Sequence, residues 1–224
     1  MEKSIVIAID GPAGSGKSTL AKSVAKELGF IYLDTGAMYR AVTFAAIKNK
    51  IEDNSEEIIK LTKEIDLELK FEVGINKIFI DNTDVTNEIR TLSVSSKVSE
   101  ISKIKEVREE LVCLQRKIGS KINIVVEGRD TTTIVFPEAA LKIFLVASIE
   151  ERAKRRFDEL KENNFTGSYE EVYKNLSERD KLDSGREISP LVKADDAVEL
   201  DTTSLSVEEE VKFIIDKAKE KQLI

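Results

Sequence analysis

Residues 11–18 constrain this chain more than any other stretch of its sequence. An apolar, largely β-branched run at 4–9 leads into Asp10, and the residues that follow are Gly11, Pro12, Ala13, Gly14, Ser15, Gly16, Lys17 and Ser18. Apolar residues then recur at helical spacing from 17 to 28, and Gly29 stands where a helix C-cap belongs. The chain is therefore expected to begin with a buried strand, a tight glycine-rich turn and a helix.

The same eight residues satisfy the G-x-x-x-x-G-K-[ST] pattern in the strand-to-helix context that the pattern requires. The glycines let successive backbone amides point at phosphate oxygens, and the helix adds its partly positive N-terminus. We expect Lys17 to bridge the β- and γ-phosphates of ATP, Ser18 to offer its hydroxyl to Mg²⁺, and Thr19 to contact the α-phosphate. The duller alternative is a glycine-rich turn with a surface lysine.

The rest of the chain alternates between strand and helix signals. Further buried-strand patterns occur at 31–33, 122–126, 141–146 and 197–200, and helical sequence separates them. This alternation predicts an α/β protein with a central parallel sheet and helices on both sides, the three-layer fold typical of P-loop NTPases.

Other local patterns predict additional elements. Apolar and polar residues alternate from 67 to 86 with a break at Gly74, which predicts a small inserted antiparallel sheet. A helix is expected at 38–47, and three later helices are expected to begin at capping boxes. These boxes are Ser148 with Glu151, Ser168 with Glu171, and Ser206 with Glu209.

Composition excludes several chemistries. The chain has no histidine and one cysteine, so histidine-based triads, histidine-ligated zinc and an internal disulfide are excluded. Cys113 is expected at a helix core position. The net charge of −7 disfavours binding to extended nucleic acid, and no apolar run approaches the ~20 residues of a membrane span. Without an export signal, a cytoplasmic location is expected.

A second motif follows the second predicted strand. Its residues are Asp34, Thr35, Gly36, Ala37, Met38, Tyr39 and Arg40. This D-[ST]-G-x-x-[YF]-R pattern resembles the nucleoside monophosphate kinases, and the resemblance implies that Thr35 and Arg40 hold the phosphate acceptor. A solvated helix charge is the alternative reading of Arg40.

Motifs in the second half make the resemblance more specific. They are Gly128, Arg129 and Asp130 before Val135, Phe136 and Pro137, and Arg179, Asp183 and Arg186 before Ser189, Pro190 and Leu191. The chain resembles the bacterial cytidylate kinase family from about residue 4 to its last helix. One departure is visible, because the family usually has a hydrophobic residue and then glycine where this chain has Thr131 and Thr132.

The resemblance implies transfer of the γ-phosphate of ATP to CMP or dCMP. It places Ser99, Arg108 and Asp130 against the cytosine. A carboxylate can accept a hydrogen bond from the exocyclic amine of this base. It also implies that Arg40, Arg129 and Arg186 clamp the acceptor phosphate, and that Arg179 and Asp183 orient the sugar. Singly, Arg108 could be a surface charge and Arg179 with Asp183 an exposed i,i+4 pair.

The remaining implied groups belong to a lid. Arg152, Arg155 and Arg156 are predicted on one side of a helix, and in related kinases such arginines close over the transferring phosphate. We assign Arg155 and Arg156 to ATP, the catalytic role to Lys17, Arg129, Arg179 and Arg186, and a mobile lid tip to 163–168. A solvated face balanced by glutamates is the alternative. Residues 201–203 are expected beside the adenine.

The expected organisation is one kinase domain, 1–224, acting as a monomer on ATP and CMP or dCMP with Mg²⁺. Its core would comprise 1–34, 117–147 and 187–224, its acceptor-binding lobe about 35–116, and its lid about 148–186. Two other functions stay open at this point: a kinase of UMP or of a hydroxylated metabolite, and a non-catalytic nucleotide switch. No partner beyond these small molecules, and neither nucleic acid nor membrane, is expected.

Overall fold

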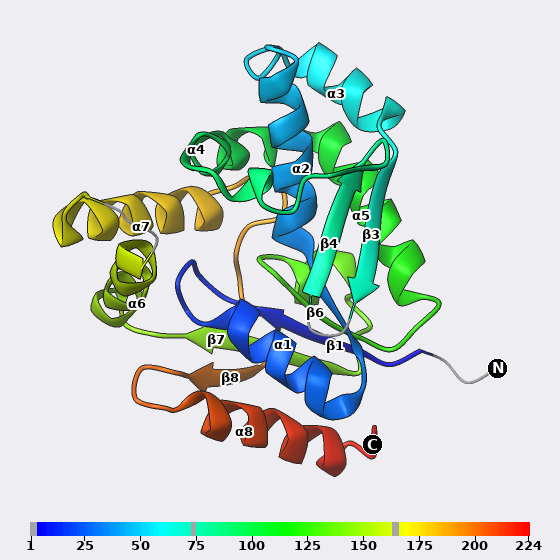
Figure 1. Cartoon of the computed structure of the whole chain (residues 1–224). Coiled ribbons are helices and arrows are strands. Elements are labelled where there is room, and N and C mark those ends of the chain that lie inside the picture. The colour runs from blue at the N-terminus through cyan, green and yellow to red at the C-terminus, as the bar shows by residue number, and fades with distance from the viewer. Residues whose placement is uncertain (1–3, 73–74, 163–165) are drawn as a thin grey trace.

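Five parallel strands form the centre of the molecule (Figure 1). The computed structural model describes residues 4–72, 75–162 and 166–224. The strand order is β2-β6-β1-β7-β8, so the first strand lies in the middle of the sheet. The strands are β1 (Val6–Asp10), β2 (Ile31–Asp34), β6 (Ile124–Gly128), β7 (Leu141–Val146) and β8 (Val198–Asp201). The predicted fold class is confirmed, with strand boundaries shifted by one or two residues.

Alternate residues of the strands face two helical layers. On one face Ile7 and Ile9 pack with Leu20 of α1 (Lys17–Leu28) and Ile214 of α8 (Val207–Glu220). On the other face Val6 and Ala8 pack in a cluster with residues of α2 (Thr35–Lys48), α3 (Ser55–Glu64), α4 (Leu92–Ile101) and α5 (Lys105–Gly119). Both faces of β1 are thus removed from water, which explains its uninterrupted apolar sequence.

The carboxyl ends of three adjacent strands carry polar residues at one edge of the sheet. In the parallel register Asp10 lies opposite Gly128, and Asp34 lies opposite Glu127. Ligands of open α/β sheets bind at this edge. The fold therefore brings together three segments that are far apart in the sequence.

Helix α2 begins three residues earlier than the predicted 38–47. The Asp34 carboxylate accepts a hydrogen bond from the Ala37 amide and caps the helix. Thr35 and Arg40 consequently belong to the first turns of a helix, and their side chains are placed by it.

The predicted antiparallel sheet is present as β3 (Leu67–Glu72), β4 (Ile75–Ile80) and β5 (Thr83–Asp84). The predicted break at Gly74 lies outside the described residues. A 3-10 turn, η1 (Glu88–Arg90), follows, and its buried Ile89 packs with Ala37 and Ala41 of α2. The inserted segment is thereby anchored beside the acceptor motif.

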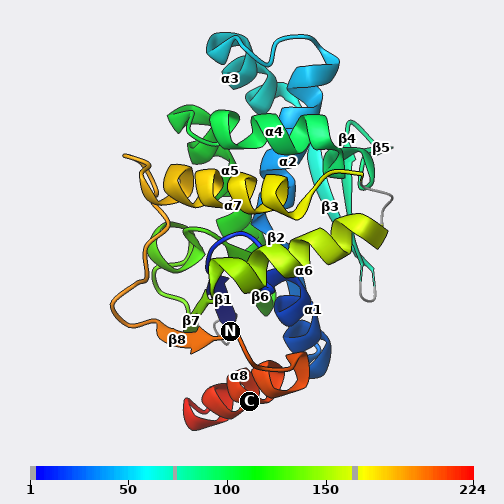
Figure 2. The ribbon, with the colours of Figure 1, turned by 90° about the vertical axis from the view of Figure 1, so that its left-hand side faces the viewer.

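Helices α6 (Ile149–Glu162) and α7 (Tyr169–Ser184) lie at one edge of the molecule in Figure 1, and Figure 2 shows them side by side, with α7 next to α4. Their apolar contact is Ala153 with Val172 and Leu176, and it includes Ala13 of the glycine-rich loop. The capping boxes at Ser168 and Ser206 are confirmed. At Ser148 the hydroxyl accepts the Glu151 amide. Residues 163–165 of the predicted lid tip lie outside the described residues.

Two local features differ from expectation. Residues Thr131–Val135 form a π-helical turn, η2, that the sequence did not indicate. Cys113 lies in α5 as expected, but its predicted core position is wrong because the side chain is exposed. The buried face of α5 follows Val107, Leu111 and Gln115, and Cys113 falls off that spacing. In the described part of the chain no helix is both long and apolar enough to cross a membrane.

Candidate active site

The glycine-rich loop has positive φ angles, which other residues rarely adopt, at Gly11, Gly14 and Gly16. Gly14 and Gly16 have φ angles of 76° and 89°. A Cβ atom at Gly11 would lie 2.6 Å from the Leu145 carbonyl oxygen. The conformation of the loop is therefore specified by its glycines and by close contact with β7.

Lys17 points back into this loop. Its side chain is 5% exposed, and Nζ donates to the Pro12 carbonyl at 2.7 Å and to Ser15 Oγ at 3.4 Å. Burial, assisted by the positive charge of Arg129, lowers the pKa of Lys17 to about 7. A buried cation held mainly by one carbonyl is well suited to an incoming anion.

Ser18 and Glu127 form a pair of oxygen groups at the start of α1. Ser18 Oγ donates to Glu127 Oε1 at 2.6 Å, and the Tyr32 hydroxyl donates to the same oxygen at 3.1 Å. Hydroxyl and carboxylate oxygens are ligands that Mg²⁺ accepts, so these residues fit the expected cation. Sequence reasoning missed Glu127, although a carboxylate ending a buried strand beside the loop was a visible signal. Thr19 is exposed in the first turn of α1.

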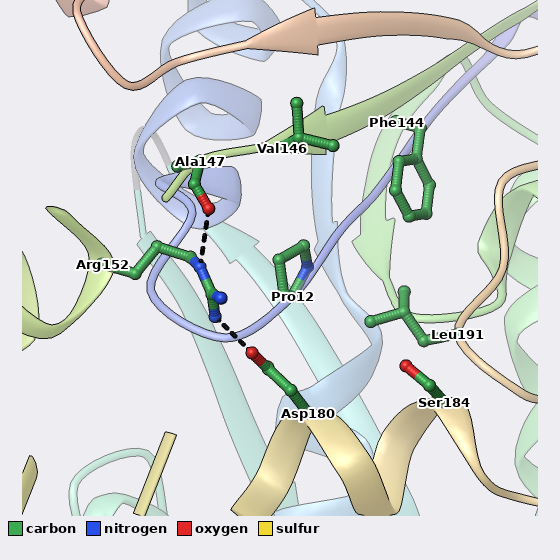
Figure 3. A pocket seen from close by; sticks show the side chains of 8 residues that line it. All are labelled: Pro12, Phe144, Val146, Ala147, Arg152, Asp180, Ser184 and Leu191. Atoms are coloured by element: carbon green, nitrogen blue, oxygen red, sulfur yellow. Dashed lines mark hydrogen bonds and ion pairs between the residues drawn. The ribbon is translucent and has the colours of Figure 1, made fainter. Parts of the chain in front are cut away.

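Arg152 was predicted on a lid face but is buried between the loop and α7. Its guanidinium donates to the carbonyls of Ala147 and Ala13, at 3.0 and 3.1 Å, and lies 2.7 Å from Asp180 Oδ2. Figure 3 shows Arg152 between Ala147 and Asp180 at a pocket of about 240 Å³ that Pro12 and Leu191 also line. Arg152 thus ties the lid helices to the loop.

The other two lid arginines have different partners. Arg155 donates to the carbonyl and hydroxyl oxygens of Thr202 and to Glu151. Arg156 is more exposed and pairs with Glu159 at 2.7 Å. The three guanidinium groups therefore do not share one binding partner. Arg155 thus lies against Thr202, which belongs to the segment expected beside the adenine.

Asp183 lies at the centre of a cluster of three arginines, a region called the acceptor side below because the resemblance places the acceptor there. This carboxylate is 1% exposed and accepts from Arg129 Nε at 2.9 Å and from Arg186 Nη2 at 2.5 Å, while Arg179 Nε lies 3.9 Å away. Burial alone would raise the pKa of Asp183, but the charges of Arg129, Arg186 and Arg179 outweigh it and keep the pKa below its usual value. Burial and the Arg129 charge lower the pKa of Arg179 to about 10.

A second buried ion pair joins α5 to the segment after β6. Arg108 is 4% exposed and pairs through Nη2 with Asp130 Oδ2, and its Nε donates to Ser189 Oγ at 3.1 Å. Its guanidinium also lies over the Tyr39 ring, 5.2 Å from the centroid. The surface-charge reading of Arg108 is therefore wrong.

Ser102 links these two ion pairs, and sequence reasoning missed it. Its carbonyl accepts from Arg108 Nη1 at 3.0 Å, and its hydroxyl accepts from Arg186 Nη2 at 3.2 Å. Ser99, the predicted base-binding residue, lies one turn earlier, and its carbonyl accepts from the Ser102 hydroxyl. Contact between Ser99 and a base stays a prediction.

The acceptor motif of α2 adds a further arginine. Arg40 Nη1 lies 3.7 Å from Asp34 Oδ2, and Arg90 of η1 lies 3.9 Å from the same oxygen. The Thr35 hydroxyl donates to the Glu127 carbonyl at 2.8 Å. Among the described residues, three buried guanidinium nitrogens have no hydrogen-bond partner: Arg40 Nη1, Arg179 Nε and Arg186 Nε.

Unsatisfied buried cationic groups indicate an anionic ligand. A buried donor without a hydrogen-bond partner lowers the stability of the folded state. Four arginines gather here around two carboxylates, Arg40 beside Asp34 and the other three beside Asp183. Arg129 and Arg179 also act electrostatically on Lys17, so the loop and the arginines lie close together. The site therefore contains two neighbouring groups of positive charge, Lys17 in the loop and the arginines around Asp183.

Comparisons with known proteins identify the family of the chain. A family model described as cytidylate kinase matches residues 7–220. The chain is 50% identical to the cytidylate kinase of Bacillus pumilus over 97% of both chains, and 49% identical to that of Bacillus subtilis over 99% of both. Solved structures from Eubacterium ventriosum and Thermus thermophilus share the fold, with TM-scores of 0.53 and 0.50 at 13% and 18% identity. They cover 97% and 98% of this chain, and the alignments span 99% and 98% of theirs.

Proposed function

The chain belongs to the cytidylate kinase family, and from that premise we propose that it transfers the γ-phosphate of ATP to CMP or dCMP, forming ADP and CDP or dCDP. The observation that supports this most strongly is the cluster of Arg129, Arg179 and Arg186 around buried Asp183, next to a phosphate-binding loop. One position fits a polyphosphate and the other a single phosphate.

On the donor side, the backbone N–H groups of residues 13–18 surround the phosphates of ATP. Lys17 exchanges its hydrogen bond to the Pro12 carbonyl for oxygens of the β- and γ-phosphates. Ser18 and Glu127 hold Mg²⁺, which neutralises charge on those phosphates when it is bound. Thr19 contacts the α-phosphate, and residues 201–203 lie beside the adenine.

On the acceptor side, Arg40, Arg129 and Arg186 bind the monophosphate, since planar guanidinium groups match phosphate oxygens in pairs. Arg179 and Asp183 orient the sugar. Buried guanidinium nitrogens without partners support this assignment, because a phosphate would satisfy them.

The acceptor is already an anion, so the reaction needs no general base to create a nucleophile. An oxygen of the CMP phosphate attacks the γ-phosphorus, and the bond to the bridging oxygen of ADP breaks. Lys17, Arg129, Arg179 and Arg186 stabilise the charge that spreads over the transferring group. A chain without histidine can therefore catalyse this transfer efficiently.

Preference for cytosine is assigned to Asp130 with Arg108, with Ser99 at the edge of the base. The Asp130 carboxylate can accept a hydrogen bond from the exocyclic amine of cytosine. Uracil presents a carbonyl oxygen at that position, which cannot donate one. The two residues already form a buried pair, which fixes the carboxylate in place.

The proposed function assigns a different role to each of three parts of the chain. The core comprises 1–34, 117–147 and 187–224, and the acceptor-binding lobe about 35–116. The lid, about 148–186, closes with Arg155 and Arg156 toward ATP and excludes water. We assign a monomer to this arrangement, because the described site is assembled from residues of one chain. A cytoplasmic location is proposed with it.

An assay with each common monophosphate tests the proposal. Purified protein is incubated with Mg-ATP and one monophosphate at a time, and ADP formation is followed. Strong stimulation by CMP or dCMP, with weaker stimulation by UMP, is the expected result. Stimulation by AMP alone, or by none of them, would overturn it.

A further inference from the structure

The residue directly before the phosphate-binding loop has an unusual set of contacts. Asp10 ends β1 and is fully buried. Its Oδ1 accepts from the amide and the hydroxyl of Thr131 at 2.9 and 2.7 Å. Its Oδ2 accepts from the amide and the hydroxyl of Thr132, both at 2.7 Å. Each carboxylate oxygen thus receives one backbone and one side-chain hydrogen bond.

These contacts join the two halves of the site. Gly11 follows Asp10 in the chain, and Asp130 precedes Thr131. A change in the position of the carboxylate would therefore move the segment carrying Arg129 and Asp130 relative to the loop carrying Lys17.

The packing around this junction leaves little freedom. Thr131 and Thr132 are fully buried, and a Cβ atom at Gly128 would lie 2.6 Å from both Thr131 Cγ2 and Thr35 Oγ1. The carbonyl of Asp130 accepts the amides of Ile134 and Val135 in the π-helical turn. Four hydrogen bonds to the Asp10 carboxylate connect this turn to the start of the phosphate-binding loop.

The two hydroxyls belong to the positions at which this chain departs from the usual pattern of the family that it resembles. A hydrophobic residue followed by glycine, which the related pattern has at 131 and 132, could supply the two amides but neither hydroxyl. We propose that Asp10, Thr131 and Thr132 are positioning residues that set the acceptor-binding segment in register with the phosphate-binding loop. This inference rests on the proposed function and extends it to residues that touch neither nucleotide.

The decisive test is the double variant T131V/T132V, which removes both hydroxyls and keeps the volume and the amides. We expect kcat/KM for CMP to fall roughly tenfold through a higher KM, because small misplacements of binding groups are costly. KM for ATP should stay within about twofold, and preference for CMP over UMP should fall, because the loop itself is intact and Asp130 is displaced. Calorimetry should show weaker CMP binding and unchanged ATP binding.

Thr62→Val is the matched control. Thr62 is a buried threonine of α3 whose hydroxyl donates to the Ile58 carbonyl, and α3 carries none of the site residues. Its loss should lower the unfolding temperature without changing either KM. Asp10→Asn should have a larger effect than the double threonine variant, since an amide NH₂ cannot accept from the facing N–H groups. If it does not fold, the threonine variants, singly or together, decide the question.

Two results would contradict the inference. Variants that lose thermal stability but keep CMP affinity, KM and the CMP to UMP ratio within about twofold of wild type would make the cluster purely structural. Failure of the wild type to bind or phosphorylate CMP, measured first in the same experiments, would instead overturn the proposed function and this inference with it.

Discussion

The phosphate-binding loop and the acceptor side both hold positive charge away from water, but by different means. In the loop a single lysine rests on a backbone carbonyl, and its pKa is lowered to about 7. On the acceptor side three arginines surround one buried carboxylate, whose pKa is kept below its usual value. The loop is a backbone structure with one charge, whereas the acceptor side is a network of paired charges.

Because of this difference, the loss of one charged side chain should have different effects in the two regions. Removing the charge of Lys17 leaves the loop backbone in place, since its glycines and β7 specify it. Removing the charge of Asp183 leaves three partly buried arginines close together without their shared carboxylate. The acceptor side should therefore be sensitive in stability, and the loop sensitive mainly in catalysis.

Asp183→Asn should give the largest effect. Loss of one partner from a buried ion pair costs about 3–5 kcal/mol of unfolding free energy. Because the pKa of Asp183 is lowered in the folded protein, its contribution is present above about pH 4 and is lost as the pH falls through the lowered pKa. Urea unfolding at pH 7, and as a function of pH below 4, measures both.

Glu178→Gln is the control for this variant. Glu178 lies on the same helix, is exposed and pairs weakly with Lys174 at 4.0 Å, so its loss should change stability by less than about 0.5 kcal/mol. Equal free energies of unfolding for Asp183→Asn and Glu178→Gln would contradict a stabilising role of the ion pairs around Asp183.

Lys17→Ala and Arg129→Ala should each lower kcat/KM by at least about a hundredfold, because both groups stabilise charge in the transition state. For Lys17 the loss should appear in kcat with little change in KM for CMP. For Arg129 it should include a higher KM for CMP. Steady-state kinetics on variants with intact far-UV circular dichroism separates the two, and wild-type turnover in either folded variant would exclude that residue from the mechanism.

Asp130→Asn should reduce discrimination between CMP and UMP by roughly tenfold to a hundredfold, the range expected for loss of one paired base contact. An amide can donate to the uracil carbonyl where the carboxylate cannot. The measurement is the ratio of kcat/KM for the two acceptors. Glu109→Gln, an exposed change on α5, should leave the ratio unchanged. An unaltered ratio in Asp130→Asn would show that Asp130 does not distinguish the two bases.

The smallest effect is a proton taken up when ATP binds. With a pKa of about 7, Lys17 is mostly neutral at pH 8, and the polyphosphate should raise its pKa toward the usual value. Binding at pH 8 should then take up close to one proton, and at pH 6 almost none. Calorimetry in buffers of different ionisation enthalpy detects this, and Lys17→Arg should abolish it because arginine stays protonated.

Much of the fold was predictable because its signals are local. The strand, loop and helix at the start of the chain, the alternation of the inserted sheet and the boxes at Ser168 and Ser206 each depend on neighbouring residues. The π-helical turn at 131–135 was not predicted, since its first residues donate hydrogen bonds to a carboxylate more than a hundred positions away. Cys113 was misplaced because its apolar neighbours lie on a different face of α5.

The site divides in the same way. The loop residues form one contiguous motif that could be identified without a structure. Burial of Arg108 could not be deduced from its helix, because its partner Asp130 lies in another segment. Asp10 and Ser102 were missed for the same reason, since each gains its role from contacts with a distant segment. Glu127 differs, because a carboxylate at the end of a strand was a signal that the sequence did contain.

A crystal structure with CMP and a non-hydrolysable ATP analogue bound together tests the central claim most directly. The account predicts that Lys17 Nζ leaves the Pro12 carbonyl for the donor phosphates. It also predicts that guanidinium nitrogens of Arg40, Arg129 and Arg186 lie about 2.7–2.9 Å from oxygens of the CMP phosphate. A structure in which these three arginines point into bulk solvent, with both nucleotides bound, would contradict it.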